Sequence, residues 1–90
     1  MLQGLTEGRI VHYVFQASDL PESRQDEVGN TAPAIVVNTW PHLNRDDGYA
    51  NLTVFPDWSN QGVPAGVLWA TSRVYDESGK PGTWHWPPRA

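Results

Sequence analysis

In Pro81-Gly82-Thr83-Trp84-His85-Trp86-Pro87-Pro88, two of the chain's five tryptophans lie within three residues of each other. If residues 83–86 are extended, side chains alternate between two faces, so Trp84 and Trp86 point one way and His85 the other. Two neighbouring indoles carry a large apolar area that is costly to leave in water. They are therefore expected either to close a small core or to form the wall of a binding site.

Four runs upstream of this stretch have the composition of β-strands. They are rich in β-branched and aromatic residues and are separated by segments of Gly, Pro, Asn and Asp. The pattern predicts one all-β domain over residues 1–90, a small five-stranded bent β-barrel or sandwich of SH3-like or OB-like kind. The expected strands are 9–15, 33–40, 50–55, 67–75 and 83–86, and the expected turns are 44–48, 57–62 and 76–82.

Residues 16–31 do not fit the strand pattern. Ser18 and Asp19 resemble a helix cap, and Pro21 follows in what would be the first turn. The segment is charged and has no apolar stripe, so it is expected to be an exposed excursion between the first two strands. The sequence leaves open whether it is an ordered loop or a short helix.

The fourth run carries a mixture of apolar and polar side chains that predicts two different faces. If it alternates strictly, Leu68 and Ala70 face the core, and Trp69, Arg73 and Tyr75 line up on the outer face. An aromatic and arginine row on an outer face is typical of a surface that contacts a partner.

Composition excludes several classes of function. The chain has no cysteine, which excludes disulfides and cysteine-ligated metal sites. Ten acidic residues against six basic ones, with a single lysine, disfavour binding of long nucleic acids, which depends on neutralising phosphates. No apolar run is long enough for a membrane span or a signal peptide, so no membrane partner is expected.

The inventory of reactive side chains predicts a protein that is not an enzyme and has no catalytic residues. There is no nucleophile motif, and no metal-ligand spacing links the three histidines, His12, His42 and His85. A metal site assembled from these histidines across strands is conceivable, but packed strand histidines are the more common arrangement. No metal site and no cofactor are predicted.

Aromatic stacking is the chemistry that remains. A base or another flat ring stacks on tryptophan with roughly 1–3 kcal/mol, and arginine makes bidentate contacts to phosphate. The sequence therefore favours a nucleotide-like small molecule as the ligand and a homo-oligomer as the assembly, because an interface offers a small domain a deeper pocket. The predicted ligand-binding residues are Arg9, Trp69, Arg73, Trp84, His85 and Trp86. The alternative is that Trp84 and Trp86 only plug the barrel.

Five segments together resemble a family of small proteins from tailed phages and prophages. They are GRIVHY (8–13), PAIVV (33–37), NLTVF (51–55), LWATS (68–72) and PGTWHWP (81–87), which cover about half of the chain. The resemblance implies viral or prophage origin and expression inside a bacterium, and it implies no activity.

Phage origin adds two function hypotheses that the residues alone do not separate. The first is sequestration of a nucleotide-like signal of host immunity in the host bacterial cytoplasm, by analogy with small binding proteins of phages. The second is a virion structural or protein-interaction module that uses the same Trp-rich surface, for head decoration or joining or for binding a host protein.

Overall fold

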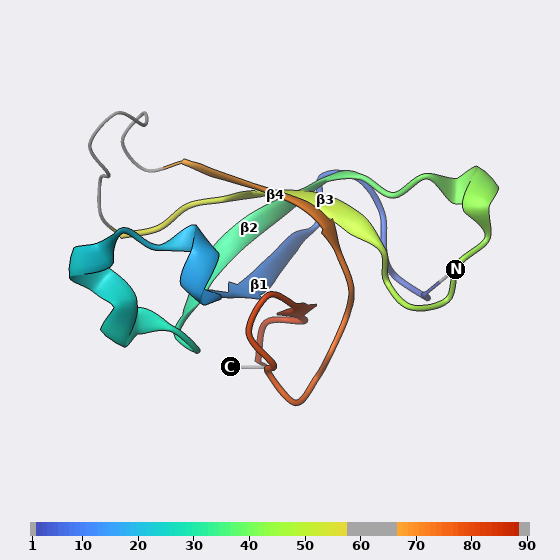
Figure 1. Ribbon diagram of the computed structural model, residues 1–90. Coiled ribbons are helices and arrows are strands. Elements are labelled where there is room, and N and C mark those ends of the chain that lie inside the picture. The colour runs from blue at the N-terminus through green and yellow to red at the C-terminus, as the bar shows by residue number, and fades with distance from the viewer. Residues whose placement is uncertain (1, 58–66, 89–90) are drawn as a thin grey trace.

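The chain forms a single curled β-sheet in the computed structural model, which describes residues 2–57 and 67–88 (Figure 1). Five antiparallel strands take the order β4-β3-β2-β1-β5 and make a half-barrel. The predicted all-β fold with five strands is confirmed. The turn expected at 57–62 lies outside the described residues apart from Asp57. The strands are β1 (Ile10–Val14), β2 (Thr31–Asn38), β3 (Ala50–Val54), β4 (Leu68–Arg73) and β5 (Trp84–His85).

The two edges of the sheet meet at one point beyond β4. Tyr75 forms a parallel bridge with Trp84 of β5. The Trp84 amide donates to the Val74 carbonyl at 3.0 Å, and the Asp76 amide donates to the Trp84 carbonyl at 2.9 Å. A sheet edge leaves main-chain groups without strand partners, so this junction satisfies part of both edges. It also holds the short β5 in place.

The excursion between β1 and β2 consists of two 3₁₀ turns, η1 (Ala17–Asp19) and η2 (Glu22–Glu27). Neither contains a buried residue, as expected for a charged segment without an apolar stripe. Leu20 between them is buried and joins the core. A third 3₁₀ turn, η3 (Pro41–Leu43), follows β2. Within the described ranges, no helix has the length or the apolar run that crossing a bilayer requires.

The core fills the inside of the curled sheet. Burial alternates along β2 and β3, as it does in strands that pack one face against a core. Trp84 and Tyr13 are the largest side chains that are completely buried. Three fully buried alanines, Ala34, Ala50 and Ala70, leave room inside the sheet for these two large rings.

A β-bulge in β4 reverses the alternation that the sequence suggested. Ala70 pairs with Leu52, but Arg73 pairs with Ala50, so β4 contains one extra residue between these pairs. Ser72 in this stretch has a φ of 59°. The bulge turns Arg73 to the core side, while Trp69 remains outside. The prediction that Trp69, Arg73 and Tyr75 share the outer face is therefore wrong, since Tyr75 also packs inward, against Trp84.

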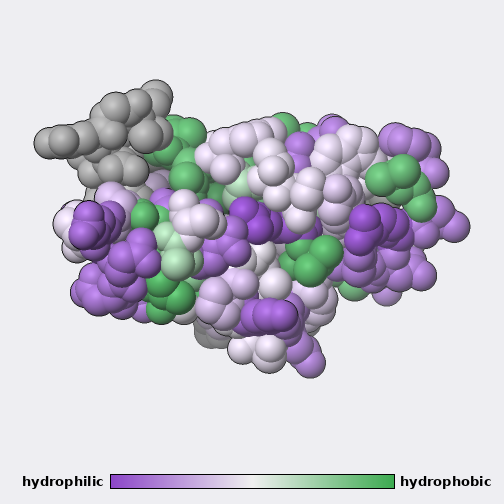
Figure 2. Space-filling view, in the orientation of Figure 1, coloured by the Kyte–Doolittle hydropathy of each residue, from purple (hydrophilic) through white to green (hydrophobic). Residues whose placement is uncertain are grey.

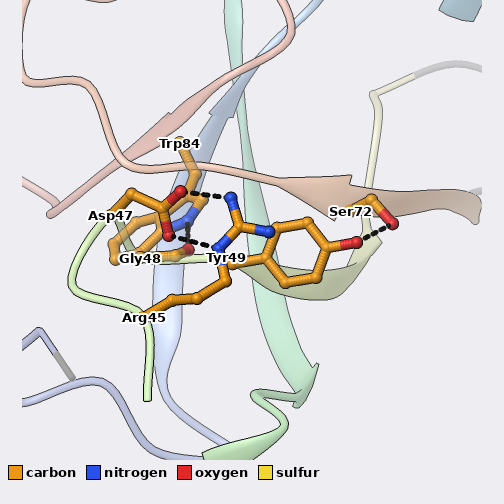
Figure 3. Close-up of polar contacts among 6 residues, drawn as sticks. All are labelled: Arg45, Asp47, Gly48, Tyr49, Ser72 and Trp84. Atoms are coloured by element: carbon orange, nitrogen blue, oxygen red, sulfur yellow. Dashed lines mark hydrogen bonds and ion pairs between the residues drawn. The ribbon is translucent and has the colours of Figure 1, made fainter. Parts of the chain in front are cut away.

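The Trp84 ring packs directly against Gly48. The indole Nε1 of Trp84 donates to the Gly48 carbonyl at 2.7 Å, across 36 residues of sequence (Figure 3). Gly48 has a φ of +74°, and a Cβ there would lie 2.6 Å from Cβ of Tyr75 and 2.9 Å from Cζ2 of Trp84. Both backbone conformation and space therefore require glycine at this position.

We expect Gly48→Ala to lower the free energy of unfolding by about 2–5 kcal/mol, from overpacking and left-handed strain together. Gly79→Ala is the matched control, because Gly79 has a φ of +80° and no atom within 4 Å of an added Cβ. It should cost only the backbone strain, about 1–2 kcal/mol. Urea unfolding of both variants measures the difference. Equal losses of unfolding free energy would show that the space between Gly48 and the Trp84 ring tolerates a side chain.

Candidate functional site

The six residues predicted to bind a ligand do not form one site. The curled sheet divides them among its core, its outer face and a hollow at one end. Trp84 and Arg73 point inward, Trp69 and His85 belong to the outside of the sheet, and Arg9 and Trp86 line the hollow.

Trp84 is inaccessible to a ligand. Its side chain has no exposed surface, its indole N–H is occupied by Gly48, and its ring packs against Tyr75 and Trp86 at centroid distances of 5.2 and 4.9 Å. For Trp84, the interpretation as a core plug is the one that the geometry supports. The expectation that Trp84 and Trp86 lie on the same side is confirmed by their ring contact.

Arg73 takes part in a polar network that fastens the excursion to the sheet. With the Gln16 amide oriented so that its oxygen faces Arg73, this oxygen accepts hydrogen bonds from Nη1 at 3.0 Å and Nη2 at 2.8 Å. The guanidinium also lies 5.8 Å from the ring centroid of Tyr13, whose hydroxyl donates to Asp19 at 2.6 Å. Burial and the hydrogen bond to Asp19 raise the pKa of Tyr13. The Arg73 guanidinium is thus occupied by contacts within the fold and is not free to bind a phosphate.

The outer face of the sheet is largely apolar over β1 to β4. The row Ile10, Ile35, Thr53 and Trp69 runs across β1 to β4 in direct register, and Trp69 is 52% exposed. Figure 2 shows apolar surface where β3 ends and β4 begins. Of eight large hydrophobic side chains exposed in the described chain, six belong to this surface. We define the outer face by these six residues, Ile10, Ile35, Val37, Phe55, Val67 and Trp69.

Sequence reasoning selected only Trp69 from this outer face. The signal for the others was present in β2, where Ile35 and Val37 alternate with the buried Ala34 and Val36. Apolar residues on both sides of a strand are also typical of strands covered on both faces. Only the three-dimensional structure shows that one side has no cover among the described residues.

His85 lies beside His12 on the outside of the sheet. The two residues pair directly across β1 and β5, with ring centroids 5.9 Å apart in an edge-on arrangement. Nδ1 of His85 is buried without a hydrogen-bond partner. Burial, and then the positive charge that His12 can carry, lower the pKa of His85. Within residues 2–57 and 67–88, no cluster of three or more histidine and acidic side chains could hold a metal ion.

Arg9 and Trp86 meet in an open hollow of about 500 Å³ at the end of the sheet. Cζ of Arg9 lies 5.0 Å from the ring centroid of Trp86, a cation–π contact. Gln3, Gly4, Ile10 and Pro87–Pro88 complete the lining. This is the one place where two of the predicted ligand-binding residues, a cation and an aromatic ring, come together.

A second arginine and aromatic cluster lies in the connection between β2 and β3 (Figure 3). Cζ of Arg45 lies 4.0 Å from the ring centroid of Tyr49, and the Trp40 ring packs on Tyr49 at 5.1 Å. Arg45 binds Asp47 through two hydrogen bonds, which lower the pKa of that carboxyl group. The Tyr49 hydroxyl donates to Ser72 at 2.9 Å. The charges are paired within the cluster, which therefore braces the loop against the bulge of β4.

Comparison with protein-family models, with curated proteins and with solved structures finds no match for this chain.

The depressed pKa of His85 predicts loss of stability on mild acidification. The unfolded chain takes up a proton near the ordinary value of 6.5, whereas folded His85 resists protonation. The stability that depends on uncharged His85 is therefore fully present above pH 6.5 and is lost as the pH falls below this value. Urea unfolding between pH 7.5 and 5.5 should show a smaller decline for His85→Gln than for the wild type. The exposed His42 supplies the control variant, His42→Gln, which should behave like the wild type.

Proposed function

We propose that this chain is a non-enzymatic interaction module that packs the outer face of its sheet against a protein surface. The observation that carries the proposal is the collection of six large apolar side chains on one side of the sheet. Their exposed fractions run from 36% for Ile35 to 57% for Ile10. Contiguous apolar surface of this kind on a small domain marks an interaction site more often than a solvated face.

The pattern of charges favours a second copy of the chain as the partner. The chain has ten Asp and Glu residues and six Lys and Arg residues, yet no Asp, Glu, Lys or Arg faces outward on β1 to β5. In a two-fold contact the same patch meets itself, so any charge on the patch would approach its own like charge. An uncharged patch on a chain with a net charge of −4 avoids that cost.

The resemblance to small phage proteins is compatible with this proposal. Under a phage origin, self-association through the outer face is compatible with a virion structural module, the alternative that the sequence left open. Sequestration of a nucleotide-like host signal receives less support in the form expected from the sequence. Its six residues are dispersed over the core, the outer face and the hollow.

We expect the wild-type protein to self-associate and Ile35→Lys to be monomeric, because the substitution places a charge at the centre of the outer face. Sedimentation equilibrium up to about 100 μM covers the range of weak interfaces. Val28→Lys is the matched control, because Val28 is 39% exposed and lies outside the outer face. It should assemble like the wild type, and circular dichroism should show the same fold for all three proteins.

Two results would count against self-association. One is a wild-type protein that is monomeric over the whole concentration range. The other is equal loss of assembly in the Ile35 and Val28 variants, which would mean that added charge anywhere disrupts it.

A further inference from the structure

The hollow at the end of the sheet has the chemistry of a small-molecule site. We propose that it binds a planar anion of mononucleotide size, with the phosphate on Arg9 and the flat ring on the Arg9–Trp86 stack. Its volume of about 500 Å³ lies within the usual range for ligand pockets, about 300–1,000 Å³. The site is distinct from the outer face, with which it shares only Ile10.

The guanidinium of Arg9 is available to bind an anion. Its side chain is exposed, and among residues 2–57 and 67–88 no carboxylate lies within ion-pair distance of it. The other arginines in the described chain have side-chain oxygens as partners. Arg24 binds Glu27, Arg45 binds Asp47, and Arg73 binds Gln16. A guanidinium offers a fork of donors that matches two phosphate oxygens.

Trp86 is held in place by the core beneath it. Its ring lies edge-on to Trp84 at 4.9 Å and 6.4 Å from the ring of Tyr75. Gly4 also lies beside the indole, where an added Cβ would stand 3.8 Å from Cζ2 and Cη2 of Trp86. A ring fixed in this way loses little freedom on binding, so stacking is less costly than on a mobile side chain.

Electrostatics select a small anion over a nucleic acid. Among the described residues, the lining contains one arginine and no acidic side chain, so a single phosphate group is matched and not repelled. The chain as a whole carries −4, which disfavours a polyanion that must run along its surface. A mononucleotide combines one phosphate with one stacking ring, which is what Arg9 and Trp86 can hold.

The test is isothermal titration calorimetry of the full chain with adenosine 5′-monophosphate, and with adenosine and inorganic phosphate separately. We expect the nucleotide to bind more tightly than either part. Arg9→Gln should weaken it by about tenfold or more, since a charge-assisted contact is lost. Arg45→Gln is the matched control, because Arg45 also lies over an aromatic ring but outside the hollow. It should change the affinity by less than about twofold.

Nuclear magnetic resonance locates the binding. The indole N–H of Trp86 and the amide of Gly4 should shift on addition of the nucleotide, and the indole N–H of Trp69 should not. Absence of binding by the wild type at millimolar nucleotide would overturn the proposal, and so would equal affinities of the wild type and the Arg9 variant. Neither result bears on the outer face, whose test is self-association.

Discussion

The hydrogen bond from the buried Trp84 indole to the Gly48 carbonyl, with the ring packing around it, is the constraint on which the rest of the structure depends. It joins the last strand to a loop 36 residues earlier in the chain. The main chain of Trp84 also bonds to residues 74–76, where the two edges of the sheet meet. A fully buried tryptophan is worth about 3–5 kcal/mol against its removal, a large share of the 5–15 kcal/mol that holds a typical domain together.

This closure determines which apolar and aromatic surfaces stay exposed. With Trp84 and Tyr13 inside the curl, the core is complete, and the apolar residues on the other side of β1 to β4 have nothing from the described chain to cover them. Trp86 extends the same aromatic cluster to the end of the sheet, where it supports Arg9. The outer face and the hollow are therefore two separate consequences of one packing arrangement.

The bulge at Ser72 shows where reasoning from the sequence failed. Strict alternation placed Arg73 beside Trp69, but one extra residue turned Arg73 toward Gln16 and Tyr13. A glycine would have hinted at an irregular strand, whereas serine at positive φ gives no such signal. His85 similarly has a partner, His12, that is distant in sequence and becomes adjacent only through strand pairing.

The sequence by itself determined the all-β class, the five strands, the exposed excursion and the shared side of Trp84 and Trp86, because these follow from local composition and from the two-residue period of a strand. Only the tertiary structure decided which tryptophan is core and which is surface, and which of the arginines in residues 2–57 and 67–88 has no side-chain oxygen as a partner. Those properties depend on strand order, on the bulge and on the Trp84 contact with Gly48, all of which join residues far apart in the chain.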